Sequence, residues 1–224
     1  MTAAPRPLDV ASWPRREHFE HYLTAVPCSY ALSVEVDAGA FVAALARSPR
    51  KTYLAQIWAL ATVVNRHDEF RMTLLADDRP AVWPVLHPSF TVFNPRRETF
   101  AAVWAPYDPD FAAFHAVAAP LLAEHADATA FRPQGSPPPN TFDVSSIPWV
   151  SFTSNTLAIE NAWRHLAPIF TLGRYARRGD TTVLPLAVQI HHAAADGFHT
   201  ARLIQEFSAL LADPSWVDSR ATPL

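Results

Sequence analysis

Cysteine and glycine are both scarce in this chain, and each scarcity excludes a class of protein. A single cysteine among 224 residues, Cys28, has no partner for an internal disulfide, so a disulfide-stabilised scaffold is excluded. The five glycines include no glycine-rich phosphate-binding loop, which argues against a Rossmann or P-loop nucleotide site.

Long apolar runs and an excess of one charge are missing as well. There are 18 lysines and arginines against 21 aspartates and glutamates, without the basic excess of a nucleic-acid-binding domain. No segment approaches the roughly 18 consecutive apolar residues of a membrane span. Residues 1–14 lack the apolar stretch of a signal peptide. We therefore expect a cytoplasmic protein that binds neither nucleic acid nor membrane.

What the chain does contain is apolar material for one substantial core, since 50% of its residues are hydrophobic. No internal repeat or linker divides it, so we expect one domain over residues 1–224. Apolar spacing with period two, or short apolar runs, predicts strands at 29–36, 169–175 and 181–191, and a hairpin from 70–75 and 81–86.

Helical spacing appears in the segments between these strands. It predicts helices at 41–45, 52–65, 198–212 and 110–126, the last one kinked or ended by Pro120. The segment 132–140 holds four prolines and one glycine and is therefore a predicted loop. The fold class that follows is α/β.

The most informative segment is QIHHAAADGFH at 189–199, where a predicted strand gives way to a predicted helix. Catalytic groups are often placed where a rigid element ends. Three interpretations are open. His191 and His192 could be ordinary residues at the end of a strand, one buried in the core and one exposed to solvent. His191, His192, Asp196 and His199 could hold a metal ion. Or a histidine could act as a general base with an orienting partner.

The metal interpretation has the least support in the sequence. Neighbouring residues on a strand point to opposite faces, so His191 and His192 are poorly placed to share one ion. Neither a cysteine cluster nor an HExxH pattern accompanies them. The wider sequence favours the acid/base interpretation.

The pattern HHxxxDG resembles that of the coenzyme A-dependent acyltransferases, and the longer HHAAADGFH is similar to the chloramphenicol acetyltransferase form. Six more segments match that family in order, from about Val10 to Leu211: WPRREHF at 13–19, VPC at 26–28, DEFRM at 68–72, FTVF at 90–93, PQG at 133–135 and IPWV at 147–150. The resemblance implies a mixed β-sheet covered by helices, an α+β two-layer sandwich. It also implies a homotrimer with active sites in clefts between subunits.

The resemblance also implies a reaction. Transfer of an acetyl group from acetyl-CoA to an alcohol requires removal of the hydroxyl proton, because a neutral alcohol is a weak nucleophile. In the family the second histidine of the motif removes it, here His192, while His191 is structural. Asp196 is a natural partner for His192 in the manner of a serine-protease triad. The resemblance pairs it instead with Arg15, in support of the site's architecture.

The acetyl carbonyl oxygen gains negative charge during the attack and needs a donor. The resemblance assigns this role to Ser145, and a shift of one residue would pass it to Ser146. Without the resemblance both are ordinary loop serines. Thr171 matches a threonine that supports the intermediate through a water molecule, although a strand threonine bonded to backbone is an equal alternative.

Coenzyme A and the acceptor are assigned by resemblance too, with no metal. Family positions near the adenine and the 3'-phosphate fall on Tyr175, Arg174 and Lys51, and Arg174 keeps the charge of a lysine. Trp149 lines the pantetheine channel, with a core tryptophan as the alternative. Acceptor-contact positions are kept at Tyr22, Cys28, Phe100, Leu157 and Ile159. Others depart from the family: His21, Val26, Arg132 with Phe131 beside it, and Asn155.

Three functions follow, in order of preference. The first is transfer of an acetyl group to a hydroxyl of chloramphenicol, which gives antibiotic resistance. The second is the same chemistry on another small, more polar alcohol or amine. The third is a non-catalytic binding protein on the same fold, which the intact set of His192, Ser145, Thr171, Asp196 and Arg15 argues against.

Overall fold

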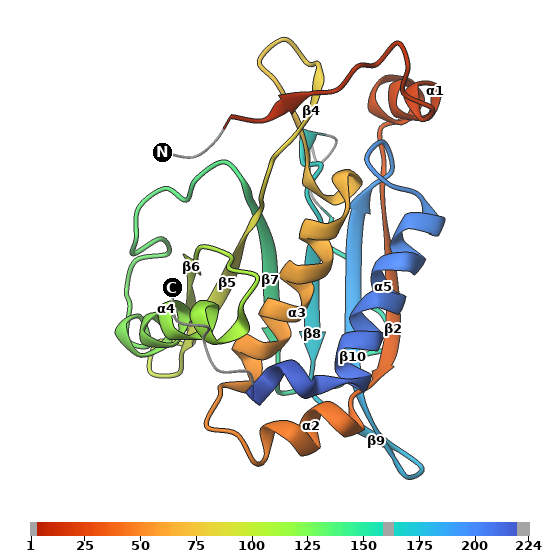
Figure 1. Ribbon diagram of the computed structural model, residues 1–224. Helices are drawn as coiled ribbons and strands as arrows, with labels where there is room; N and C mark the ends of the chain where they lie inside the picture. Colours follow the sequence, from red (N-terminus) through yellow and green to blue (C-terminus); the bar gives the residue numbers. More distant parts are fainter. Residues whose placement is uncertain (1–3, 159–163, 219–224) are drawn as a thin grey trace.

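The computed structural model describes residues 4–158 and 164–218. Its main feature is a seven-stranded sheet in the order β2-β10-β8-β7-β5-β6, with β9 paired to β10 (Figure 1). The neighbours β5–β7 and β7–β8 are parallel and the other pairs are antiparallel. The strands are β2 Ser29–Asp37, β5 His87–Asn94, β6 Thr99–Trp104, β7 Thr141–Ile147, β8 Ile169–Gly173, β9 Ala176–Arg178 and β10 Thr181–His191.

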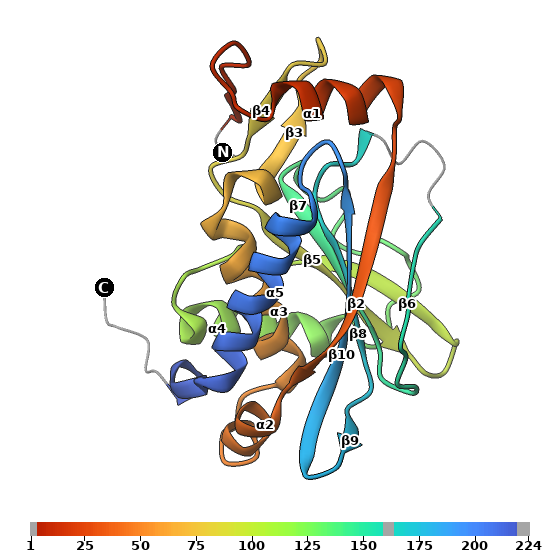
Figure 2. The ribbon, with the colours of Figure 1, turned by 90° about the vertical axis from the view of Figure 1, so that its right-hand side faces the viewer.

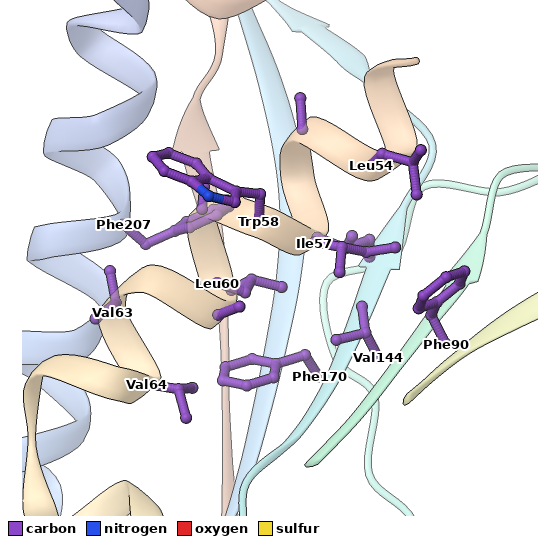
Figure 3. Packing of buried hydrophobic residues seen from close by; sticks show 14 of the residues in the cluster. Leu54, Ile57, Trp58, Leu60, Val63, Val64, Phe90, Val144, Phe170 and Phe207 are labelled. Atoms are coloured by element: carbon purple, nitrogen blue, oxygen red, sulfur yellow. The ribbon is translucent and has the colours of Figure 1, made fainter. Parts of the chain in front are cut away.

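Helices cover one face of this sheet, and the opposite face carries none in the described part of the chain (Figure 2). They are α2 Gly39–Leu45, α3 Thr52–Arg66, α4 Phe111–Glu124 and α5 Gly197–Ala212. Figure 3 shows side chains of α3 packed onto strand residues such as Phe90, Val144 and Phe170. The expected mixed sheet covered by helices is confirmed. No described helix has the length and apolar character to cross a membrane.

β10 is buried on both faces, which explains its nearly continuous apolar sequence. Its even-numbered residues from Leu184 to Ile190 join the core under the helices. The other face is covered by the loop that follows β7. The side-chain amide of Gln189 accepts from Leu157 N at 2.8 Å and donates to Leu157 O at 2.9 Å. Phe152 lies against Gly173, where a β-carbon would come within 3.0 Å of its ring.

A smaller structure closes one end of the main sheet. It is a three-stranded sheet of β1 Arg6–Pro7, β4 Pro80–Val82 and β3 Met72–Leu74. Next to it α1 Arg16–Glu20 continues into a π-helical turn, His21–Ala25. Short 3₁₀ segments lie at Asp68–Arg71 and Pro214–Asp218. The expected hairpin is confirmed, although its strands are shorter than the sequence pattern suggested.

The predicted helix at 110–126 is confirmed, and of the two alternatives for Pro120 an early end is excluded, because α4 continues to Glu124. Pro120 and Ala116, the residue whose carbonyl loses its helical donor, are both exposed, so water can replace the missing bond. Between the predicted strands at 169–175 and 181–191 lies a further short strand that was not expected, since residues 176–178 form β9 and pair with 181–183 of β10.

Candidate active site

His192 follows the last residue of β10 and is held from two sides. Its backbone N–H donates to Cys28 O at 2.9 Å. Its ring stacks on Tyr22 with centroids 3.7 Å apart and planes 5° from parallel. Tyr30 meets the same ring edge-on at 5.1 Å. The imidazole is therefore fixed in one plane at the end of a central strand.

Arg15 fixes the backbone around this histidine. Its guanidinium donates to Ala194 O at 2.7 Å and to His192 O at 3.5 Å, and it lies 3.7 Å from an Asp196 carboxylate oxygen. The structure thus brings Arg15 and Asp196 together, as the resemblance implies. In the described part of the chain no hydrogen bond joins Asp196 to the His192 ring.

The Asp196 carboxylate serves the start of α5 as well. It accepts from Phe198 N at 3.1 Å, and His199 Nδ1 lies 2.7 Å away. Burial raises the pKa of Asp196, but the opposing effect of His199 and Arg15 is larger in sum. The pKa of Asp196 therefore lies below its usual value. The carboxylate stays charged at neutral pH and ties α5, His199 and Arg15 to one point.

His191 is buried and belongs to the turn rather than to an open site. Its Nδ1 accepts from Ala193 N at 3.1 Å, and its carbonyl accepts from Ala194 N and Ala195 N. Across residues 4–158 and 164–218, no group of three or more His, Cys, Asp or Glu side chains is placed to hold a metal ion.

Ser145 lies far from this histidine, on the face of β7 that carries no helix. The alternation of β7 buries Phe142 and Val144 under the helices, so Ser145 faces away from them and Ser146 faces towards them. Ser145 is paired with Thr171 of β8 in the sheet. It lines a cavity of about 830 Å³, which we call the open-face cavity.

The open-face cavity gathers four of the ten expected acceptor residues. Its wall includes Phe100, Phe131, Arg132 and Leu157, together with Ser145. The Phe100 and Phe131 rings meet at 5.7 Å, and the Arg132 guanidinium lies 5.6 Å from the centre of the Phe131 ring. Its size falls within the range of small-molecule sites.

Four other expected acceptor residues lie near His192 instead. Tyr22 stacks on it, Cys28 O binds its backbone, and His21 packs edge-on against Tyr22 at 4.9 Å. Val26 ends the same π-helical turn and is exposed. Elsewhere, Asn155 N donates to Ser33 Oγ of β2 at 3.2 Å. Ile159 lies outside the described residues.

Within one chain, His192 and the residues around it lie far from Ser145 and the open-face cavity. Ser145 pairs with Thr171 and Thr171 pairs with Ala187, so these three residues form one row across the sheet. His192 follows Ala187 by five residues (192 − 187). At about 3.3 Å per residue, with two strand spacings of about 4.8 Å besides, the separation exceeds about 15 Å. Within one chain His192 and Ser145 therefore lie well apart.

A second cavity, of about 430 Å³, lies on the helix side of β7 and gathers the expected coenzyme residues. Trp149, Arg174 and Tyr175 line it, and Lys51 immediately precedes Thr52 of its wall. We call it the helix-side cavity. Ser146 lines this cavity. Thr91 of β5 lines both cavities, so they approach each other there.

Two residues of the helix-side cavity were missed from the sequence. Gln56 of α3 donates to the Tyr175 hydroxyl at 2.7 Å, and burial raises the pKa of Tyr175 to about 12. Tyr53 is partly buried, burial raises its pKa to about 12, and its hydroxyl lies 3.4 Å from Thr91 Oγ1. A glutamine next to the apolar positions of a predicted helix was the one sequence signal available for Gln56.

The chain is similar in sequence to chloramphenicol acetyltransferases. The family model of chloramphenicol acetyltransferase matches residues 6–208. A chloramphenicol acetyltransferase of Streptomyces acrimycini is 70% identical over 213 residues, which are 95% of this chain and 97% of the relative. One of Escherichia coli is 39% identical over 199 residues, 89% of this chain and 90% of the relative.

Solved structures share the fold. A chloramphenicol acetyltransferase has a TM-score of 0.80 at 20% sequence identity, covering 93% of this chain and 100% of the other. A dihydrolipoamide acetyltransferase of Azotobacter vinelandii has a TM-score of 0.66 at 18% identity, covering 97% of this chain and 93% of the other.

Proposed function

Because the chain belongs to the chloramphenicol acetyltransferase family, we propose that it transfers an acetyl group from acetyl-CoA to a hydroxyl of chloramphenicol. The protein is an acyltransferase. Its 70% identity to a chloramphenicol acetyltransferase extends over 95% of this chain and 97% of the relative. The observation that supports the chemistry best is the His192 ring, fixed by Tyr22 at the end of β10.

His192 is the general base of this proposal. Its neutral imidazole takes the proton from the acceptor hydroxyl as the oxygen attacks, and such catalysis is worth about 100- to 10,000-fold in rate. Stacking on Tyr22 fixes the ring plane, and Arg15 holds the carbonyls of His192 and Ala194. Asp196 acts through Arg15 and α5, since its carboxylate bonds to them and not to the base.

Ser145 is the donor to the acetyl carbonyl oxygen, which gains negative charge during the attack. Its place in the wall of the open-face cavity supports this role over Ser146, which faces the helix side. Thr171 is paired with Ser145 in the sheet and faces the same side, because Phe170 and Leu172 face the helices, so its hydroxyl supports the same oxygen through a water molecule.

Acetyl-CoA supplies the thioester, and the helix-side cavity fits its carrier. Trp149 and Tyr175 offer flat apolar walls for the pantetheine arm and the adenine. Arg174 in the wall and Lys51 next to the wall residue Thr52 bring positive charge to the cavity, which suits phosphate groups. Thr91, common to both cavities, marks the place where the thioester reaches the acceptor.

The separation of His192 from Ser145 supports an assembled enzyme. Since the two lie more than about 15 Å apart along the sheet of one chain, the base of one subunit must face the open-face cavity of another. A cyclic trimer repeats one such heterologous contact three times and closes. We therefore propose a homotrimer with each active site between two subunits.

One observation favours a second acceptor class. The open-face cavity contains Arg132 and also Asp143 and His165, whose side chains are 4.0 Å apart. These side chains are exposed in the single chain, so a ligand that covers them without bonding to them leaves buried unpaired groups, each of which costs roughly 1–3 kcal/mol. A small and more polar alcohol or amine is therefore the alternative acceptor, with chloramphenicol as a side substrate.

A thiol-release assay tests the proposal. Purified protein with acetyl-CoA is expected to release free coenzyme A only when chloramphenicol is added, and to release far less after His192→Ala. Release with a polar alcohol but hardly any with chloramphenicol would favour the second acceptor class. No release with any acceptor, from folded protein, would contradict enzymatic function.

A further inference from the structure

His115 of α4 binds the beginning of α3. Its Nε2 accepts the backbone N–H of Lys51 at 3.0 Å, and its Nδ1 lies 3.4 Å from an Arg50 guanidinium nitrogen. Phe111, one helical turn earlier, meets the ring edge-on at 5.7 Å and carries Arg50 over its face at 5.8 Å. The imidazole thus links α4 to Arg50 and Lys51, the two residues that lead into α3.

This point adjoins the helix-side cavity. Lys51 is the N-cap of α3, and its side chain makes no cap hydrogen bond. The first residues of the helix, Thr52 and Tyr53, line the cavity directly. The conformation of Lys51 therefore sets both the direction of its ammonium group and the position of the first helical N–H groups, which an α-helix leaves without internal partners.

The bond requires one protonation state of the imidazole. A backbone N–H can donate only to an unprotonated nitrogen, so Nε2 carries no proton and a neutral ring has its proton on Nδ1. Burial, then the charges of Arg50 and Lys51, hold the pKa of His115 below its usual value. The groups that face the ring from the neighbouring loop are cations, and the bond to Lys51 persists at neutral pH.

We propose that His115 is a positioning residue for coenzyme A: by binding the Lys51 backbone it directs Lys51 and the start of α3 towards a phosphate of the donor. The inference rests on the proposed function, in which Lys51 and Arg174 receive that phosphate. His115 touches neither substrate. Its effect reaches the reaction only through the donor's phosphate and leaves His192, Ser145 and the open-face cavity unchanged.

Steady-state kinetics with two donors test this. Acetyl-CoA and 3'-dephospho-acetyl-CoA differ only in the 3'-phosphate. His115→Leu removes the acceptor, and loss of one hydrogen bond predicts a KM for acetyl-CoA raised about fivefold. The KM for the dephospho donor, the KM for chloramphenicol and kcat are expected to stay unchanged. His115→Gln, whose amide oxygen can accept from Lys51 N, is expected to restore most of the affinity. Val117→Ala, exposed on the same helix, is the matched control.

A double-variant cycle keeps the test independent of folding defects. In Lys51→Met the lysine contact is already lost, so adding His115→Leu is expected to raise the KM for acetyl-CoA no further. An equal rise for both donors, or a full additional rise in the Lys51→Met background, would mean that His115 only stabilises the fold and would overturn the inference. If the wild type binds both donors equally, the phosphate assignment of the proposed function fails, and the inference fails with it.

Discussion

Replacing Asp196 with asparagine separates a supporting carboxylate from a catalytic one. Asparagine keeps an oxygen that can accept the Phe198 N–H, so the cap of α5 survives. What is lost is the charge that faces Arg15 at 3.7 Å and His199 at 2.7 Å. Hydrogen bonds to charged groups are worth about 1.5–3 kcal/mol, and partial exposure reduces this. We expect a loss of stability of about 2 kcal/mol.

That loss is measurable by thermal unfolding. For a chain of this size 1 kcal/mol shifts Tm by about 2–4 °C, so Asp196→Asn is expected to lower it by about 4–8 °C. The pKa of Asp196 is lowered in the folded state, so its contribution is present above the unfolded pKa of about 3.9 and is lost as pH falls through the folded value. The difference in Tm between variant and wild type should therefore shrink in acid. Asp77→Asn is the control, because Asp77 forms an exposed ion pair with Arg79, and its Tm should change little.

The kinetic outcome decides the role. If Asp196 supports the site through Arg15, activity falls together with Tm, and Arg15→Val reproduces both changes. An Asp196→Asn protein with unchanged melting and a strongly reduced kcat would instead show that the carboxylate orients His192 directly. That result would refute the assignment of Asp196 to Arg15 and α5.

Three further outcomes are expected. His192→Ala should lower kcat by about 100- to 10,000-fold with little change in acetyl-CoA binding by calorimetry; a variant with a tenth of normal activity would exclude it as the base. Gly173→Ala would bring a β-carbon within 2.9 Å of Pro185 Cβ, and such overpacking predicts about 1–3 kcal/mol lost in denaturant unfolding; an unchanged midpoint would contradict the close contact. Burial lowers the pKa of His87 and of His115. Below about pH 6.5 the unfolded chain therefore binds more protons than the folded one, and stability should fall as the pH drops. His115→Gln should weaken this pH dependence of Tm, and a pH profile identical to that of the wild type would contradict the contribution of His115.

The long elements of the fold could be predicted because their environments are uniform. α5 buries one stripe against the sheet, α3 is buried nearly all round and β10 is buried on both faces, so helical spacing and apolar runs identify them. β6 shows why other strands escaped prediction. Ala101 and Val103 enter the core, but Phe100 and Trp104 line the open-face cavity, so apolar residues occupy both faces and the alternation disappears.

The site could be predicted only in part, for a similar reason. The HHAAADGFH motif points to His192, because the motif is local to one turn, and the role of His192 as base stays a prediction. The separation of His192 from Ser145 depends on the strand register that links Ser145, Thr171 and Ala187, and no local pattern carries that register. His115 was not singled out for the same reason, since its partner Lys51 lies 64 residues away in the sequence.

Complementation of two inactive variants tests most directly whether the base and the oxygen donor come from different subunits. His192→Ala lacks the base and Ser145→Ala lacks the donor, so each alone should be nearly inactive. In trimers assembled from an equal mixture, an intact site needs an unmodified histidine from one chain and an unmodified serine from the next. Each occurs with a chance of one half, so random assembly predicts about one quarter of the wild-type activity. A co-assembled mixture no more active than its parents would contradict an active site shared between subunits.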